Sequence, residues 1–293
     1  MKLEFTKMHA LGNDFVVIDN RHDELRRIAR LAMKLCDRRF GIGADQLLLL
    51  CRSGTADFRM RIFNADGSEV EMCGNGIRCL GKYIWDNILC CEESAYAKKY
   101  CETIDSIAIE TIAGIRHIHK SGNLFRIDMG EPVFEPEKIP VVAEFVRKKL
   151  KDGKIIESPL KAGNKTFKIT CVSMGNPHAV IFVKDVSSVS LKHYGPLIEN
   201  HSLFPNRTNV EFIEIIDERN VKMSVWERGV GETMACGTGA SASAVASALS
   251  GLTGRRVAVH LPCGKLSIHW SEKDNHVYMT GPAVKVFDGT IDL

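Results

Sequence analysis

The hydrophobic positions of the chain recur with two different periods. In residues 58–62 apolar and basic side chains alternate, which is the period of a half-buried β-strand. In residues 23–38 the apolar positions recur every three to four residues, and this predicts an amphipathic helix that Phe40-Gly41 ends. The buried face of that helix is expected to carry Leu25, Ile28, Ala29, Ala32, Leu35 and Cys36. Both patterns together indicate a mixed α/β chain.

A cysteine-containing pattern occurs twice, 163 positions apart. Cys73 stands in Glu-Met-Cys-Gly-Asn-Gly and Cys236 in Met-Ala-Cys-Gly-Thr-Gly. Helical spacing follows the first cysteine over residues 77–88, and a stretch of small residues follows the second over residues 240–249. Each cysteine is therefore predicted to lie at the amino end of a buried helix.

The offset of 163 extends well beyond the two cysteines. It aligns residues 12–18 with 175–181 and residues 60–64 with 223–227, and it places Gln46 opposite Asn209. A period this long exceeds that of a solenoid repeat. The pattern indicates two copies of one domain, related by approximate twofold symmetry, with matching residues facing a cleft between them.

Composition narrows the class of protein. A hydrophobic fraction of 45%, a charged fraction of 26% and a formal net charge of +3 are typical of a soluble globular protein without a polyanionic partner. The first residues lack the apolar core of a signal peptide, and no apolar run is long enough to span a membrane. We expect a cytoplasmic protein that binds neither nucleic acid nor membrane.

The ten cysteines are scattered irregularly along the chain. A disulfide framework is typical of small exported domains, so we expect reduced thiols here. The close groupings, Cys73/Cys79 and Cys90-Cys91 with Cys101, lack the paired C-x-x-C spacing of a zinc site. The sequence therefore predicts no metal site.

Position sets Cys73 and Cys236 apart from the other eight cysteines. The amino end of a helix presents unpaired N–H groups and the positive pole of the dipole, both of which favour a thiolate. A contribution of up to roughly 2 kcal/mol lowers a thiol pKa by roughly 1.5, from about 8.5 towards neutrality. One thiolate could then remove a proton from a carbon while an opposing thiol delivers another, which inverts a stereocentre. Two helix ends aimed at the substrate carboxylate would stabilise the resulting charge in place of a pyridoxal cofactor.

Other interpretations of the same residues remain open from the pattern alone. A single C-G-x-G would be no more than a tight turn before a helix, although its duplication at one offset favours function. Residues 237–242 fit the G-x-G-x-x-A fingerprint of dinucleotide binding, but residues 255–262 lack the acidic residue that this fingerprint expects about 20 positions further on. A nucleophilic cysteine with His178 as its base would leave the second cysteine motif unexplained.

The residues now carry a specific resemblance. Asn64-Ala65-Asp66-Gly67-Ser68 followed by residues 73–78, Cys-Gly-Asn-Gly-Ile-Arg, resembles the signature of the diaminopimelate epimerases. Residues 227–239 are similar to the second cysteine motif of that family, and the resemblance extends from His9 to Ala283. It implies interconversion of LL- and meso-diaminopimelate, on the route to lysine and cell-wall precursors, with the two cysteines as acid and base and no metal or organic cofactor.

The resemblance also implies roles for individual residues. His178 and Glu227 match residues that tune the cysteines, and Arg228 is the expected clamp for the distal carboxylate of the substrate. The positions that match substrate-holding residues of the family are Asn13, Gln46, Asn64, Asn176, Asn209, Glu227 and Arg228, together with the amides of Gly74, Asn75, Gly237 and Thr238.

For the fold, the resemblance implies two α/β (α+β) domains, each a curved mixed sheet wrapped around a central helix, with the active site between them. We expect an N-terminal domain of residues 1–131 plus 282–293, a C-terminal domain of residues 132–281, and a homodimer. The cysteine-rich segment 90–105 is longer than the linker that the family places there. We assign no function to the basic residues 147–151.

Two alternative functions follow from other classes. A proline or hydroxyproline racemase on the same fold would also use two cysteines, although the signature at Asn64 and Arg228 favours a longer substrate. A non-catalytic protein that grips an amino acid between two lobes would need no reactive cysteine pair, so thiol reactivity distinguishes it from an enzyme.

Overall fold

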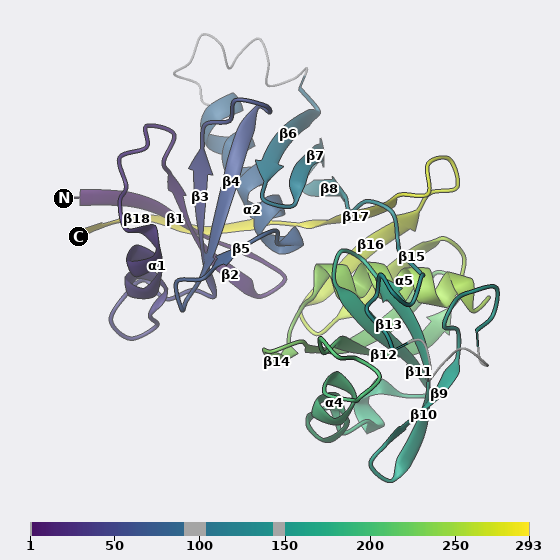
Figure 1. Cartoon of the computed structure of the whole chain (residues 1–293). Coiled ribbons are helices and arrows are strands. Elements are labelled where there is room, and N and C mark those ends of the chain that lie inside the picture. The colour runs from purple at the N-terminus through teal and green to yellow at the C-terminus, as the bar shows by residue number, and fades with distance from the viewer. Residues whose placement is uncertain (1, 91–103, 143–149, 293) are drawn as a thin grey trace. The chain divides into compact units, whose positions relative to one another are not determined.

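The computed structural model describes residues 2–90, 104–142 and 150–292. The chain divides into two compact units: unit 1 comprises Met1–Asp128 and Thr280–Leu293, and unit 2 comprises Met129–Met279. The sequence placed the changes of domain at residues 131 and 281. Each unit consists of a mixed sheet and a central helix (Figure 1). Two segments singled out in the sequence lie partly outside the described residues. They are the cysteine-rich segment 90–105, of which residues 91–103 are not described, and the basic segment 147–151, of which residues 147–149 are not described.

Unit 1 builds its sheet around the helix α2 (Gly74–Ile84), which the π-helix η1 (Trp85–Leu89) continues. The strands pair in the order β18-β1-β2-β3-β4-β6-β7-β8, and the short β5 pairs with β4. The β2–β3 and β4–β6 pairs are parallel, and the others are antiparallel. The strands are β1 (Lys2–Ala10), β2 (Asn13–Asp19), β3 (Gln46–Cys51), β4 (Phe58–Asn64), β5 (Glu69–Val70), β6 (Ser106–Thr111), β7 (Gly114–Ser121), β8 (Leu124–Asp128) and β18 (Val284–Asp292).

Unit 2 repeats this topology around the helix α5 (Gly237–Leu249). The strands pair in the order β9-β10-β11-β12-β13-β15-β16, and the short β14 pairs with β13. The parallel pairs β11–β12 and β13–β15 stand where unit 1 has its own two parallel pairs. The strands are β9 (Ser158–Ala162), β10 (Lys165–Ser173), β11 (Pro177–Val183), β12 (Asn209–Asp217), β13 (Asn220–Glu227), β14 (Gly231–Thr233), β15 (Arg256–Leu261) and β16 (Gly264–Trp270). The strand β17 (Val277–Pro282) begins in unit 2 and ends in unit 1.

The offset of 163 in the sequence is reproduced in the elements. β1 and β10 differ by 163 at both ends, as do α1 (Ile28–Cys36) and α4 (Leu191–Glu199), and α2 and α5 begin 163 positions apart. The turn before each second strand also repeats, because Gly12 and Gly175 adopt φ angles of 87° and 89°. The predicted α/β fold with two repeated domains is confirmed.

Both faces of the sheet are covered in unit 1, and this explains the unbroken apolar run of β3. Leu47 and Leu49 belong to the cluster under α1, whereas Leu48 faces the first turn of α2 at Gly76. Side chains of a strand alternate between the two faces of the sheet, so a strand covered on both faces is apolar at every position. The packing fixes α2 against the sheet and thereby places Cys73.

The predicted helix over residues 23–38 is shorter than expected, because α1 spans only Ile28–Cys36. Asp23 and Arg27 both adopt φ angles of 54°, in the left-handed region, which a right-handed helix does not include. The helix therefore begins only after Arg27. Leu25 still packs into the apolar cluster from the preceding loop, which explains why it continued the hydrophobic pattern. Cys36 is buried, as the pattern predicted.

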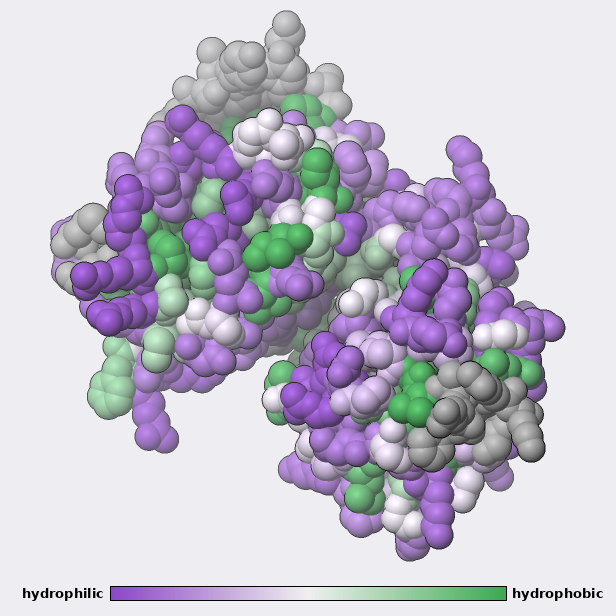
Figure 2. Space-filling model, in the orientation of Figure 1, coloured by the Kyte–Doolittle hydropathy of each residue, from purple (hydrophilic) through white to green (hydrophobic). Residues whose placement is uncertain are grey.

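Exposed side chains on the face shown in Figure 2 are mostly hydrophilic, with apolar side chains scattered among them. No helix within the described residues has the length and hydrophobicity needed to cross a membrane. Seven cysteines within the described residues are free thiols, but Cys90 is disulfide-bonded. The expectation of ten reduced thiols is therefore wrong at Cys90.

Candidate active site

The two cysteines of the repeat cap their helices in the same way. Cys73 precedes α2 with φ −139° and ψ 117°, and its sulfur accepts the amide N–H of Gly76 at 3.4 Å. Cys236 precedes α5 with φ −125° and ψ 114°, and its sulfur accepts the amide N–H of Gly239 at 3.4 Å. An extended cap residue turns its side chain back over the first helical turn, where the N–H groups have no intrahelical partner. Each sulfur consequently faces the positive end of a helix.

Unit 1 brings three predicted site residues together at Cys73. The side-chain oxygen of Asn13 lies 3.7 Å from the Cys73 sulfur and accepts a hydrogen bond from Asn75 at 3.2 Å. Asn13 in turn donates to Asp45 at 2.8 Å, which fixes the orientation of its amide. Gly74 follows Cys73 as the first helical residue. The polar group next to the sulfur is thus held from two sides.

A buried arginine supports the same turn. The side chain of Arg78 is fully buried and donates to the carbonyl of Gly74 at 3.3 Å, to Asn75 Oδ1 at 2.8 Å and to the carbonyl of Pro282 at 3.3 Å. Burial lowers the pKa of Arg78 to about 10, and the nearby cysteines, first Cys79 and then Cys73, act in the opposite direction. Arg78 therefore holds the first turn of α2 to the last segment of the chain and brings positive charge behind Cys73.

The remaining predicted residues of unit 1 form a separate pair. Gln46 on β3 donates to the side-chain oxygen of Asn64 on β4 at 2.8 Å, and Asn64 donates to the Ser68 hydroxyl at 3.0 Å. The two strands place these residues opposite each other in the antiparallel register. The buried carbonyl oxygen of Gln46 has no hydrogen-bond partner among the described residues, so it remains able to accept a hydrogen bond.

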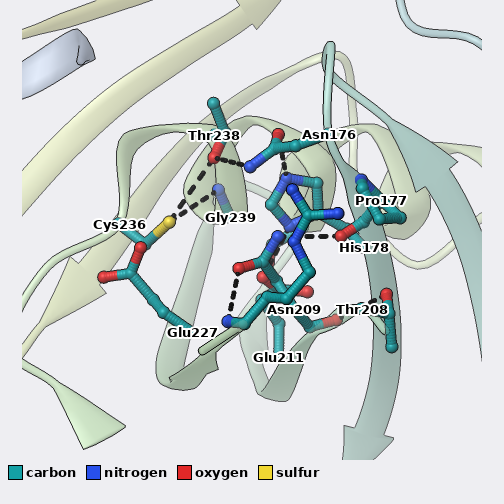
Figure 3. Close-up of polar contacts among 12 residues, drawn as sticks. Asn176, Pro177, His178, Thr208, Asn209, Glu211, Glu227, Cys236, Thr238 and Gly239 are labelled. Atoms are coloured by element: carbon teal, nitrogen blue, oxygen red, sulfur yellow. Dashed lines mark hydrogen bonds and ion pairs between the residues drawn. The ribbon is translucent and has the colours of Figure 1, made fainter. Parts of the chain in front are cut away.

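Unit 2 surrounds Cys236 with a continuous set of hydrogen bonds (Figure 3). The Thr238 hydroxyl lies 3.4 Å from the Cys236 sulfur and accepts a hydrogen bond from the Asn176 amide at 3.3 Å. The Asn176 carbonyl oxygen lies 2.9 Å from His178 Nε2, and His178 Nδ1 lies 2.7 Å from Glu211 Oε1. Asn176 and Thr238 correspond to Asn13 and Asn75 by the offset, so the repeat preserves this polar contact.

Glu227, Asn209 and Arg228 are further predicted site residues of unit 2. Figure 3 shows the Glu227 carboxylate beside Cys236, and Glu227 Oε1 accepts a hydrogen bond from the Thr233 hydroxyl at 2.5 Å. Asn209 donates to the carbonyl of Pro177 at 2.8 Å and accepts the amide N–H of Arg228 at 2.9 Å. The guanidinium of Arg228 is exposed, and its Nη1 lies 3.4 Å from the carbonyl of Asn206. Of these three residues only Arg228 is exposed, whereas Glu227 is half-buried and Asn209 is buried.

The structure corrects the expected acidity of Cys236. Burial raises the pKa of the Cys236 thiol well above its ordinary value, and the carboxylates of Glu227 and Glu211 raise it further. Hydrogen bonds from Thr238 and Gly239 act in the opposite direction but are weaker. The helix-end argument omitted the loss of hydration of the thiolate on burial, which disfavours the charged form. A pKa this high keeps Cys236 in the thiol form at neutral pH.

Comparisons with known proteins identify the family of this chain. Residues 5–135 and 170–286 match the family described as "Diaminopimelate epimerase". A diaminopimelate epimerase from Acetivibrio thermocellus is 48% identical over 99% of this chain and 99% of its own length, and one from Methanococcus maripaludis is 47% identical over 99% and 100%.

The chain belongs to the diaminopimelate epimerase family.

Solved structures support the fold of this diaminopimelate epimerase family member. A phenazine biosynthesis protein of the PhzF family from Bacillus anthracis superposes with a TM-score of 0.67 at 17% identity, over 100% of both chains. A hydroxyproline epimerase from Agrobacterium vitis superposes with a TM-score of 0.67 at 12% identity, over 99% of this chain and 92% of its own. These likenesses concern the fold alone.

Sequence reasoning about the family missed Glu211, and it quoted Arg78 without assigning it a role. Glu211 has a signal in the sequence, because a carboxylate interrupts the apolar residues of the strand that follows Asn209. Its effect requires the fold, since only the parallel pairing of β11 and β12 brings it to His178. Within residues 2–90, 104–142 and 150–292 no group of three or more His, Cys, Asp or Glu side chains could hold a metal ion.

The raised pKa of Cys236 predicts how its alkylation depends on pH. In the ligand-free protein, modification of Cys236 by iodoacetamide should be slow at pH 7 and should still be rising steeply above pH 9, because only the thiolate reacts. Mass spectrometry of the peptide that carries Cys236 measures this rate. The exposed Cys263 provides an internal reference. A rate for Cys236 that levels off near pH 7 would contradict the assignment.

Gly239 is required by close packing under the helix. A β-carbon at this position would lie 2.8 Å from Glu211 Oε1 and 3.3 Å from Cys236 Cβ. The substitution Gly239→Ala is therefore expected to lower the free energy of unfolding by about 1–3 kcal/mol, the usual cost of overpacking. Urea denaturation measures the change. Gly254→Ala serves as the control because its nearest neighbour is 3.9 Å away; equal stability of both variants would contradict the packing argument.

Proposed function

We propose that the chain interconverts LL- and meso-2,6-diaminopimelate, a step in the biosynthesis of lysine and peptidoglycan precursors. Membership of the family and near-complete coverage of relatives that carry this name support the proposal. The observation that carries it within this chain is the duplicated cap: Cys73 and Cys236 occupy equivalent positions, and each sulfur accepts the third amide of its helix.

The proposed chemistry uses the two cysteines as an acid–base pair on one α-carbon of the substrate. One thiolate removes the α-proton, and the other thiol delivers a proton to the opposite face, so the centre inverts. The raised pKa of Cys236 keeps it in the thiol form before substrate binds, which is the form that delivers a proton. We expect His178 and Glu227 to tune this balance, and Glu227 is already near enough to Cys236 to affect its pKa.

The amino ends of the two helices supply what a cofactor supplies in other racemases. The amides of Gly74, Asn75, Gly237 and Thr238 are expected to bind the carboxylate of the reacting centre and to stabilise the negative charge that develops next to it. We therefore propose a reaction without pyridoxal phosphate or metal. The side chains expected to hold the rest of the substrate are Asn13, Gln46, Asn64, Asn176, Asn209, Glu227 and Arg228.

A substrate panel tests this function. The purified chain is incubated separately with LL-diaminopimelate, meso-diaminopimelate, L-proline and trans-4-hydroxy-L-proline, and the stereoisomers are resolved by chiral chromatography. We expect conversion of both diaminopimelate isomers to the same equilibrium mixture and none of the two prolines. Racemisation of proline would favour the alternative racemase, and unchanged substrates throughout would favour the amino-acid-binding protein.

We also propose a homodimer in the cytoplasm. The strand β18 exposes Val284, Val286 and Phe287, an apolar surface suited to a second copy of the chain. Seven free cysteines among the described residues, Cys73 and Cys236 included, support a compartment that keeps catalytic thiols reduced, although Cys90 is disulfide-bonded. Light scattering at assay concentration is expected to give twice the mass of the chain, and the mass of a monomer would contradict the dimer.

A further inference from the structure

A buried pair of titratable groups lies directly beneath the first turn of α5. His178 on β11 and Glu211 on β12 are both fully buried, and His178 Nδ1 lies 2.7 Å from Glu211 Oε1. Glu211 Oε1 would also lie 2.8 Å from a β-carbon at Gly239, so the carboxylate reaches the backbone of the turn. The cap residue of that turn is Cys236.

Unit 1 fills the equivalent space with hydrocarbon. The offset of 163 places Phe15 opposite His178, Leu48 opposite Glu211 and Gly76 opposite Gly239. A β-carbon at Gly76 would lie 3.3 Å from the Phe15 ring and 3.1 Å from Leu48. An apolar pair therefore satisfies the packing beneath such a helix, whereas a buried carboxylate lowers stability unless it is compensated. The histidine and glutamate beneath α5 must serve something other than packing.

Hydrogen bonds connect this pair to Cys236 (Figure 3), and the amide of Asn176 sets the direction in which they run. The Asn176 amide donates to the Thr238 hydroxyl oxygen, so its carbonyl oxygen faces His178 Nε2 and accepts a hydrogen bond from the Nε2–H group. With a proton on Nε2, the remaining proton of the pair lies between His178 Nδ1 and Glu211. The Thr238 hydroxyl accepts from Asn176, so its own proton is available for donation to the Cys236 sulfur, which lies 3.4 Å away.

We propose that Glu211 is a positioning residue for Cys236: by fixing the proton on His178 Nε2, it orients Asn176 and Thr238 so that the Thr238 hydroxyl donates to the Cys236 sulfur. Donation of this kind stabilises the thiolate of Cys236, whereas a reversed chain would leave that sulfur without a hydroxyl donor. In unit 1, Phe15 and Leu48 stand in place of the His178–Glu211 pair. The inference rests on the proposed role of Cys236 as an acid–base group.

Besides His178, three other titratable groups of the described residues lie around Glu211. They are Cys171 on β10, Glu227 on β13 and Cys236 itself at the start of α5. Cys171 is fully buried, and burial together with Glu211 raises its pKa. Burial likewise raises the pKa of Glu211, while His178 opposes this effect. Because His178 Nε2 donates to Asn176, Nδ1 of the neutral imidazole accepts a hydrogen bond from the Glu211 carboxyl. A glutamine amide at position 211 can make the same donation, but a leucine cannot.

Alkylation of Cys236 by iodoacetamide at pH 9 tests the proposal without substrate, so its outcome is independent of whether diaminopimelate is turned over. Glu211→Leu interrupts the chain of hydrogen bonds, and Thr238→Val removes the hydroxyl that contacts the Cys236 sulfur. Each variant is expected to slow modification of Cys236 about tenfold, the effect of one hydrogen bond to a charged group. Glu211→Gln and Thr238→Ser retain the donors and should match the wild type. Cys73 should react at the wild-type rate in all four variants.

The double variant His178→Phe with Glu211→Leu installs the apolar pair of unit 1 and provides a well-packed alternative if Glu211→Leu fails to fold. It should have a wild-type circular dichroism spectrum together with slow alkylation of Cys236. Wild-type alkylation of Cys236 in the folded double variant or in Thr238→Val would overturn the proposal. Equally slow alkylation in Glu211→Gln would also overturn it, because the conservative variant would then fail to rescue the effect.

Discussion

Replacing either Cys73 or Cys236 by serine is expected to lower kcat for the epimerisation of LL-diaminopimelate by about 10³-fold. A hydroxyl is far less acidic than a thiol, so it cannot exchange a proton at the α-carbon near neutral pH, and general acid–base catalysis contributes roughly 10²–10⁴-fold. Because each cysteine serves one face of the substrate, the loss should be similar for both variants. Appearance of the meso isomer, followed by chiral chromatography, measures it.

Cys263→Ser is the matched control for these two substitutions. Cys263 is a free and exposed thiol, and it belongs to neither helix cap. Its replacement should leave kcat within the error of the assay. A Cys73→Ser or Cys236→Ser variant that retained more than a tenth of the wild-type kcat would contradict the two-thiol mechanism, whereas a loss in Cys263→Ser would indicate damage to the fold.

Replacing Arg228 by leucine is expected to reduce kcat/KM for LL-diaminopimelate by roughly 10–100-fold. The guanidinium is the exposed cation next to Glu227, and a hydrogen bond to a charged group contributes about 1.5–3 kcal/mol. At about 1.4 kcal/mol for each factor of ten, this range gives the expected loss. Initial rates at several substrate concentrations measure it.

Free L-lysine is diaminopimelate without the distal carboxylate. It therefore shows whether Arg228→Leu removes a contact to that carboxylate or damages the site in general. Exchange of the α-proton of L-lysine with deuterated buffer should be weak in the wild type and no weaker in Arg228→Leu. Arg219→Leu, an exposed arginine in the turn between β12 and β13, should behave as the wild type with both compounds. An equal loss with lysine would contradict the assignment of Arg228 to the distal carboxylate.

The sequence was sufficient for those features that depend on local pattern and repetition. The offset between Cys73 and Cys236 predicted the duplicated topology, because two segments with the same hydrophobic pattern bury the same faces. It also predicted the helix caps, since a cysteine followed by Gly-x-Gly leaves the amides of the first turn open to its sulfur. Asn13 and Asn176 were predicted to belong to the site, and the fold places each of them next to its helix end.

The sequence was insufficient where distant strands determine the environment. The acidity of Cys236 depends on burial and on two carboxylates from β12 and β13, which no motif around the cysteine contains. The start of α1 depends on the left-handed backbone at Arg27, whereas the hydrophobic period continues through Leu25. Glu211 acquires its partner only through the parallel pairing of two strands whose facing residues lie about thirty positions apart.

Deuterium incorporation during the first turnovers of LL-diaminopimelate in deuterated buffer tests the central claim most directly. If two thiols act on opposite faces of one α-carbon, the meso product should carry one deuterium at the inverted centre, while the remaining LL substrate is still unlabelled. Mass spectrometry of the separated isomers gives both values. Deuterium that enters the LL pool as fast as the meso isomer forms would mean that one base serves both faces, and a chain that neither labels nor inverts diaminopimelate would contradict the proposed function itself.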